Sequence, residues 1–149
     1  RQSAVQAADI ALKRSLDWLK ANSASNAMNS NNGTGYYAAE GAAIPAGPDG
    51  EELFEQFDWD NSAVHLGTDP TTGNRLDYVV ERQCSTSGSV DAANAHCAFT
   101  EITSNSATCA GCSHLVGGVP PNVGVAQYRV TVRVLGPRNT VSFVQSNQY

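Results

Sequence analysis

The stretch YRVTVRVLGPRNTVSFVQSNQY, residues 128–149, decides the fold expected of this chain. In its first half, apolar side chains at every second position alternate with arginine and threonine, which is the pattern of a half-buried strand. Gly136 and Pro137 predict a turn, after which Val141 and Phe143 again occupy alternate positions. Two antiparallel strands are therefore expected at this end of the chain. The side chains expected to share one face of the first strand are Tyr128, Val130, Val132 and Val134.

Residues 1–21 predict a long amphipathic helix, because their apolar residues recur at spacings of three and four. An isolated helix of this length is marginally stable, so its apolar stripe should pack on the sheet. Trp18 is expected at one edge of the core, and Gln6, Asp9 and Lys13 on the opposite side. The stripe expected to form the core or assembly face comprises Val5, Ala8, Leu12, Leu16 and Leu19.

The middle of the chain predicts loops and two further strands. Residues 36–48 read as a covering loop, and residues 51–57 as a short helix with Asp49 as its N-cap. Strands are expected at 63–66 and, more firmly, at 76–82. We therefore expect one α+β domain over 1–149, with about four antiparallel strands. Its parts are a helix (1–21), a loop region with a short helix (22–62) and a sheet region (63–149) that contains a cysteine-bearing loop (84–127).

Composition excludes some classes of function. The formal net charge is −5, and only nine lysines and arginines are present, so we expect no nucleic-acid partner. The basic residues Lys13, Arg14 and Lys20 read as a solvated helix face. No apolar run reaches about 18 residues. Because the chain starts at Arg1 inside an expected helix, we infer a fragment or a processed form of a longer exported protein.

All four cysteines lie between positions 84 and 112, in a chain rich in Asn, Ser and Thr, which favours two structural disulfides. Cys84 could pair with Cys97 and Cys109 with Cys112, or Cys84 with Cys112 and Cys97 with Cys109. Two rival interpretations use the Cys109/Cys112 pair. One is a thiol-redox site, although the βαβ setting of such sites is missing. The other is a zinc site formed by Cys97, Cys109 and Cys112 with His96 or His114.

No catalytic motif is recognisable. The chain has no G-x-S-x-G sequence, and its histidines, His65, His96 and His114, lie in no recognisable nucleophile–base–acid pattern. Glycine-rich phosphate loops after a strand are also missing. We therefore expect a protein that is not an enzyme and that holds no cofactor and no metal.

Three segments resemble the PilX family of type IV pilus assembly proteins, which are minor pilins. AVQAADIAL at 4–12 resembles the helix motif of the family. YVVERQC at 78–84 resembles a strand that ends in Glu-Arg before a cysteine, and YRVTVRVLGPRNTVSFVQS at 128–146 resembles the closing hairpin. The extra Cys109/Cys112 pair departs from the pattern. The resemblance favours a bond between Cys84 and Cys97.

The resemblance implies a pilin-like fold and a function in assembly. Family members are held in the inner membrane by an N-terminal half-helix, which is missing here, so this chain would be a soluble fragment. They join other minor pilins at the tip of a cell-surface pilus, above the major pilin and often with a PilY-type adhesin. Ala4, Ala7, Ala8 and Ala11 would let neighbouring helices approach closely. A pseudopilin of a type II secretion system is the alternative that shares this fold.

Overall fold

Three long strands form the centre of the sheet in the computed structural model, which describes residues 2–22, 25–90, 95–101 and 124–149. β3 (Arg75–Arg82) pairs antiparallel with β6 (Tyr128–Leu135), and β6 pairs antiparallel with β7 (Val141–Gln148). Each of these strands has eight residues. The expected C-terminal hairpin and the expected strand at 76–82 are therefore confirmed.

The other strands make the sheet mixed and larger than expected. β2 (Val64–Thr68) pairs antiparallel with β3, whereas β1 (Tyr36–Tyr37) pairs with β3 in parallel. The expectation of a wholly antiparallel sheet of about four strands was wrong, because a segment assigned to a loop contributes a fifth strand. The long loop expected at 84–127 likewise contains two short strands, β4 (Phe99–Glu101) and β5 (Gly124–Ala126), which pair with each other.

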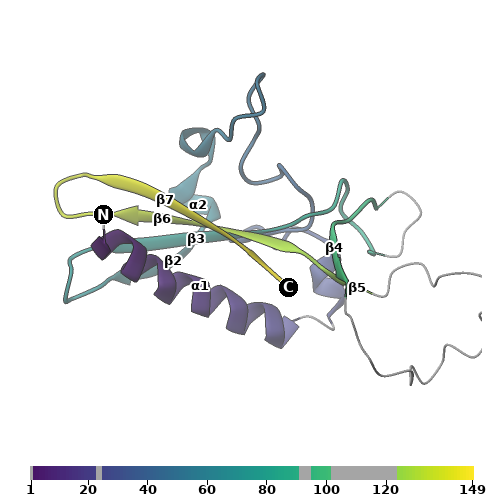
Figure 1. The fold of residues 1–149 in the computed structure, drawn as a ribbon, viewed down its shortest axis with the longest axis horizontal. Helices are drawn as coiled ribbons and strands as arrows, with labels where there is room; N and C mark the ends of the chain where they lie inside the picture. Colours follow the sequence, from purple (N-terminus) through teal and green to yellow (C-terminus); the bar gives the residue numbers. More distant parts are fainter. Residues whose placement is uncertain (1, 23–24, 91–94, 102–123) are drawn as a thin grey trace, which may run out of the picture.

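Helix α1 (Gln2–Asn22) lies along one face of the sheet (Figure 1) and contacts β3, β6 and β7. Its side chains meet the alternate apolar residues of β3 and β6, which point towards it. At the end of α1, the Trp18 ring packs on Tyr36 with ring centroids 5.2 Å apart. The fully or nearly fully buried residues that make this core include Ala8, Ala11, Leu19, Tyr36, Val80, Val130 and Val132.

The buried face of α1 differs from the stripe expected from the sequence. Val5 is 54% exposed, so its assignment to the core face was wrong. Leu12 is only half-buried, whereas Ala11 and Ser15 are completely buried. The helix is turned so that its smallest side chains meet the sheet, because the large valine and tyrosine side chains of the strands already fill the space between the layers. Ala8 and Leu19 are buried as expected, and Leu16 is half-buried.

This orientation of α1 also contradicts the expectation that its alanines let neighbouring helices approach closely. Ala7, Ala8 and Ala11 are buried against the chain's own sheet, so they are not available to a neighbouring helix. Ala4 is partly buried and packs against the same core.

The opposite face of the sheet is covered by the segment between β1 and β2. This segment contains a short 3-10 helix, η2 (Phe54–Gln56), and a four-residue helix, α2 (Trp59–Ser62), which lies across the sheet from α1 (Figure 1). The short helix expected at 51–57 is present only as η2, and its N-cap is Leu53 rather than the expected Asp49. Asp58 caps α2 by accepting a hydrogen bond from the backbone of Asn61.

Candidate functional site

The outward side of α1 is exposed along most of the helix. Gln6, Asp9, Lys13 and Asp17 are exposed along it, as the sequence predicted. Aspartate and lysine four positions apart on such a face support the helix without needing a partner. This surface also carries two exposed large apolar residues, Val5 at 54% and Ile10 at 48%. The helix thus has one face committed to its own sheet and another that can contact other molecules.

A disulfide bond closes the end of β3. Cys84 and Cys97 are bonded, with their Cα atoms 3.9 Å apart, and the two residues form an isolated β-bridge. The pairing that the resemblance favours is thereby confirmed, and the nested pairing of Cys84 with Cys112 is excluded. Cys109, Cys112 and His114 lie outside the described residues.

Two cross-strand ion pairs line the outer face of the sheet, which is the face turned away from α1. Asp77 and Glu81 on β3 lie directly opposite Arg133 and Arg129 on β6. Both carboxylate side chains are completely buried, and each pairs with the arginine opposite it. A buried carboxylate is tolerated only when paired and hydrogen-bonded, so these arginines permit acidic residues inside a core strand. We call these four residues the charged ladder.

Glu81 also fastens the covering segment to the sheet. One of its carboxylate oxygens accepts hydrogen bonds from the backbone amides of Ala43 and Ile44, at 3.0 and 3.2 Å. Its other oxygen accepts from Arg129, which also pairs with Glu52 in the covering segment. The ladder therefore holds two layers together.

His65 extends the ladder towards solvent on the side of β2. Its Nδ1 contacts the buried carboxylate of Asp77, and its Nε2 lies 3.0 Å from the backbone carbonyl of Asp60. Both partners are acceptors, so the doubly protonated ring satisfies both contacts. The hydrogen bond to Asp77 raises the pKa of His65 above its ordinary value. An imidazole that donates from both nitrogens has no free lone pair, which a general base requires.

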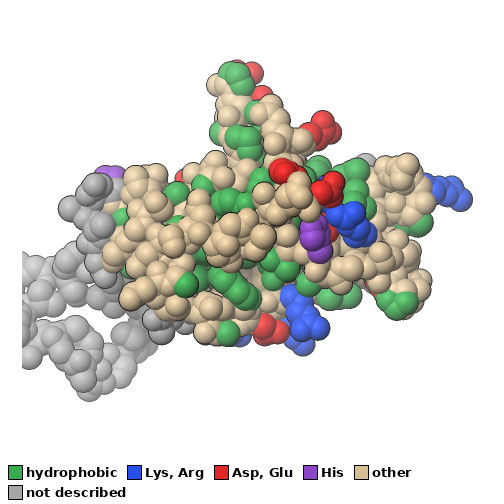
Figure 2. All heavy atoms as spheres, turned by 180° about the vertical axis from the view of Figure 1, so that it is seen from behind, with side chains coloured by type: hydrophobic (Ala, Val, Ile, Leu, Met, Phe, Trp, Pro, Cys, Tyr) green, Lys and Arg blue, Asp and Glu red, His purple; other side chains and the backbone are tan. Residues whose placement is uncertain are grey.

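Asp60 lies at the surface beside Asp77, His65, Arg75 and Arg133 and completes this group of charged side chains. Its carboxylate accepts hydrogen bonds from Arg133 at 3.0 Å and from Arg75 at 2.9 Å, and these bonds lower its pKa. Figure 2 shows acidic, basic and histidine side chains gathered on one part of the molecular face seen there. All the charges of this group are used in contacts with one another.

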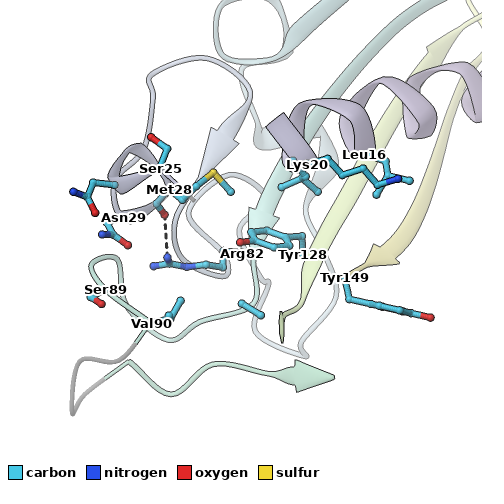
Figure 3. A pocket seen from close by; sticks show the side chains of 13 residues that line it. Leu16, Lys20, Ser25, Met28, Asn29, Arg82, Ser89, Val90, Tyr128 and Tyr149 are labelled. Carbon is cyan, nitrogen blue, oxygen red and sulfur yellow. Dashed lines mark hydrogen bonds between the residues drawn. The ribbon is translucent and has the colours of Figure 1, made fainter. Parts of the chain in front are cut away.

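A cavity of about 380 Å³ lies between the end of α1 and the 3-10 helix η1 (Asn26–Asn29). Arg82, which is buried at one side of it, donates to the carbonyl of Met28, and this bond is drawn in Figure 3. Arg82 also donates to the carbonyls of Ala38 and Gly88, so it joins three loops. The described residues that line the cavity include no carboxylate and no histidine, and the apolar part of the lining includes Leu16, Leu19, Met28 and Val90.

The described part of the chain offers neither a cluster of metal ligands nor a helix suited to crossing a membrane. No group of three or more His, Cys, Asp or Glu side chains within it is placed to hold a metal ion. Neither of its α-helices combines the length and apolar character that crossing a bilayer requires.

Comparison of the chain with protein-family models, curated proteins and solved structures gives no match.

The charged ladder is the feature that sequence reasoning missed. The sequence does contain a pattern that indicates the ladder. Asp77 and Glu81 are four residues apart on one strand, and Arg129 and Arg133 are four residues apart on another. Residues four apart in a strand share a face. Acidic and basic pairs with the same spacing on two expected strands can therefore face each other across a sheet.

Proposed function

We propose that this chain is a minor pilin of the type IV pilus, similar to the PilX family, and that it acts as a non-enzymatic structural subunit. It works by non-covalent assembly with other pilins. In this proposal the fold is pilin-like: a long helix is held on a sheet by one face and offers its other face to neighbouring subunits.

The division of α1 into two faces is the observation that carries the proposal. The buried face consists mainly of small residues packed on β3 and β6, whereas the opposite face is exposed through most of the helix. A subunit that assembles through helices needs such an uncommitted face. Val5 and Ile10 provide apolar contact area on it. Loss of about half of a large side chain's exposure on assembly would contribute about 1 kcal/mol per residue.

The three segments that resemble the family belong to one packing unit, which also supports the proposal. Residues 4–12 lie in α1, residues 78–84 run from β3 to the bonded Cys84, and residues 128–146 form the β6–β7 hairpin. α1 contacts β3, β6 and β7, and β3 pairs with β6. Segments that are distant in sequence but resemble one family are thus in contact in the fold.

The proposed partners follow from the resemblance. The chain would join other minor pilins in a complex that primes assembly, sit at the pilus tip with a PilY-type adhesin, and lie above the major pilin. An N-terminal segment would hold it in the inner membrane before assembly. Its final location would be the bacterial cell surface.

Deletion of the gene and complementation test this function. Loss of surface fibres on deletion, restored by the full-length gene, is the expected result, together with co-purification of other minor pilins. Complementation with Val5→Glu and Ile10→Glu together should fail, whereas Arg138→Glu, in the exposed turn between β6 and β7, should restore fibres. Intact fibres with a loss of protein secretion would instead assign the chain to a type II pseudopilus.

A further inference from the structure

The outer edge of β7 is open in the described part of the chain. There, β7 pairs with β6 alone, through all eight residues and without a bulge. Alternate residues of a strand direct their backbone groups to opposite sides, so about half of these residues direct N–H and C=O away from β6. The strand reads VSFVQSNQ, has no charged residue and no proline, and buries none of its residues.

The opposite edge of the sheet, formed by β1 and β2, is protected against strand addition, whereas the edge of β7 is not. β1 has only two residues, and β2 has five with an irregular register between His65 and Gly67. Short strands, bulges, charges and prolines are the usual means by which proteins prevent strand addition at an edge. β7 uses none of them over a length that is sufficient for strand addition.

Two hollows lie beside β7 on the outer face of the sheet. The first, of about 350 Å³, adjoins Val141 and Phe143, and three carboxylates and one arginine line it. These are Glu55, Asp58, Asp60 and Arg133, and Glu55 has no ion-pair partner among the described residues. The second, of about 310 Å³, adjoins Gln145 and Asn147 and is polar. The side chains of Gln83 and Arg129 in its lining each have a buried nitrogen without a hydrogen-bond partner there.

We propose that the edge of β7 binds an extended segment of another protein, which adds to the sheet as a further strand. The segment carries an apolar side chain flanked by lysine or arginine. The apolar side chain enters the hollow at Val141 and Phe143, and the basic groups meet Glu55 and Asp58. Backbone hydrogen bonds supply affinity, and the alternate side chains supply specificity, as in other cases of strand addition.

A second copy of this chain fits the edge less well. Two copies related by a twofold axis perpendicular to the sheet would pair β7 with β7 antiparallel. The apolar end at Val141 would then lie beside the polar end at Asn147. The strand also has no lysine or arginine to place beside Glu55. We therefore infer a different protein as the occupant.

Amide hydrogen exchange on the intact protein is the first test, and it needs no ligand. Within β7, amides that bond to β6 should exchange slowly, and the alternate amides should exchange rapidly. Equal protection of both sets in the monomer would mean that the edge is already covered, and this would overturn the proposal. Equal protection together with concentration-dependent dimerisation in ultracentrifugation would make a second copy the occupant and would also overturn it.

Binding of ten-residue strand-forming peptides is the second test. The probe is a capped peptide of alternating Val and Thr with one Phe between two lysines, and its control has glutamates in place of the lysines. Alternate amides of the bound peptide point towards β7 or away from it. N-methylation of the set that points towards β7 should weaken binding of the lysine peptide at least about tenfold. N-methylation of the other set should not weaken it. Binding should slow exchange of the rapid β7 amides.

A charge reversal completes this test. Glu55→Lys should weaken the lysine peptide about threefold at low salt and strengthen the glutamate peptide by a similar factor. Glu55 is exposed, so the variant should fold normally. The proposal is overturned if neither peptide binds at about 1 mM, if both methylated registers bind equally, or if protection appears on α1 instead of β7. None of these results depends on whether the chain is a pilin.

Discussion

Asp77 and Arg133 face each other across β3 and β6, and Arg133 binds one oxygen of the Asp77 carboxylate through both Nε and Nη2, at 3.0 and 2.7 Å. The other oxygen of Asp77 contacts His65 and Arg75. The Asp77 side chain is completely buried, so within the described part of the chain these neighbours compensate its charge. One buried carboxylate thus joins side chains from three strands, β2, β3 and β6.

Asp77→Asn should lower the free energy of unfolding by about 3 kcal/mol, because it removes one partner of a buried ion pair. Urea denaturation followed by circular dichroism measures this change. Asp17→Asn is the matched control, since Asp17 is exposed on α1 and should change stability by less than about 0.5 kcal/mol. Equal small effects of both changes would show that Asp77 is not central to the ladder.

His65 should make the stability of the protein depend on pH. Its pKa is raised in the folded state, so its stabilising contribution is complete below the unfolded pKa of 6.5 and is lost as the pH rises through the folded value. The stability difference between wild type and His65→Gln should therefore be larger at pH 6 than at pH 9. Urea titrations at several pH values measure this difference, and an NMR titration of the ring locates the folded pKa. A difference that grows towards high pH would contradict the imidazolium–Asp77 contact.

Gly35→Ala should destabilise the fold more than Gly41→Ala does. Both glycines have positive φ, 79° and 72°, so alanine costs about 1 kcal/mol of backbone strain at either site. At Gly35 a Cβ would also overlap Cγ2 of Val64, whereas at Gly41 it would meet open space. We expect a total loss of about 3 kcal/mol for Gly35→Ala. Thermal unfolding of both variants would show whether the packing of Val64 on Gly35 accounts for the difference.

The disulfide should stabilise the fold by about 3 kcal/mol, because Cys84 and Cys97 are 13 positions apart and the bond limits the unfolded chain. Replacing both with alanine and comparing urea midpoints tests this value. Peptide mapping without reduction should recover the two cysteines in one linked species. Recovery of Cys84 linked to Cys112 would contradict the bond described here.

Ala11→Leu tests the observed orientation of α1. Ala11 is completely buried against the sheet, so the larger side chain should cost about 1–3 kcal/mol. Gln6→Leu is the control on the exposed face of the same helix and should cost little or nothing. If the large-residue stripe expected from the sequence faced the sheet instead, Ala11 would lie outside that stripe and both changes would cost little.

The sequence predicted the long elements of the fold well, because their patterns are local. Alternation located β3, β6 and β7, and spacings of three and four located α1. The face of α1 was assigned wrongly because periodicity gives weight to large apolar residues such as Val5. Ala11 and Ser15 are buried because of the large side chains on the sheet, which helix periodicity does not reveal.

Other features depend on contacts between distant residues. β1 is only Tyr36 and Tyr37, and it becomes a strand because β3 offers a free edge at Val80 and Glu81, beyond the residues that pair with β2. The site was predictable only in part: Cys84 and Cys97 were recognised, and the polar face of α1 was correct. The burial of Asp77 and Glu81 was missed because each depends on an arginine about fifty residues away in the sequence.

Site-specific photocross-linking in cells tests most directly the central claim that the exposed face of α1 is an assembly surface. The full-length protein would carry p-benzoylphenylalanine at Ile10, or at Asn61 on the opposite side of the sheet as a control. Irradiation of assembled fibres should link position 10, but not position 61, to other pilin subunits. Cross-links from position 61 alone, or no pilin cross-link from position 10 in fibres that contain the protein, would contradict the claim.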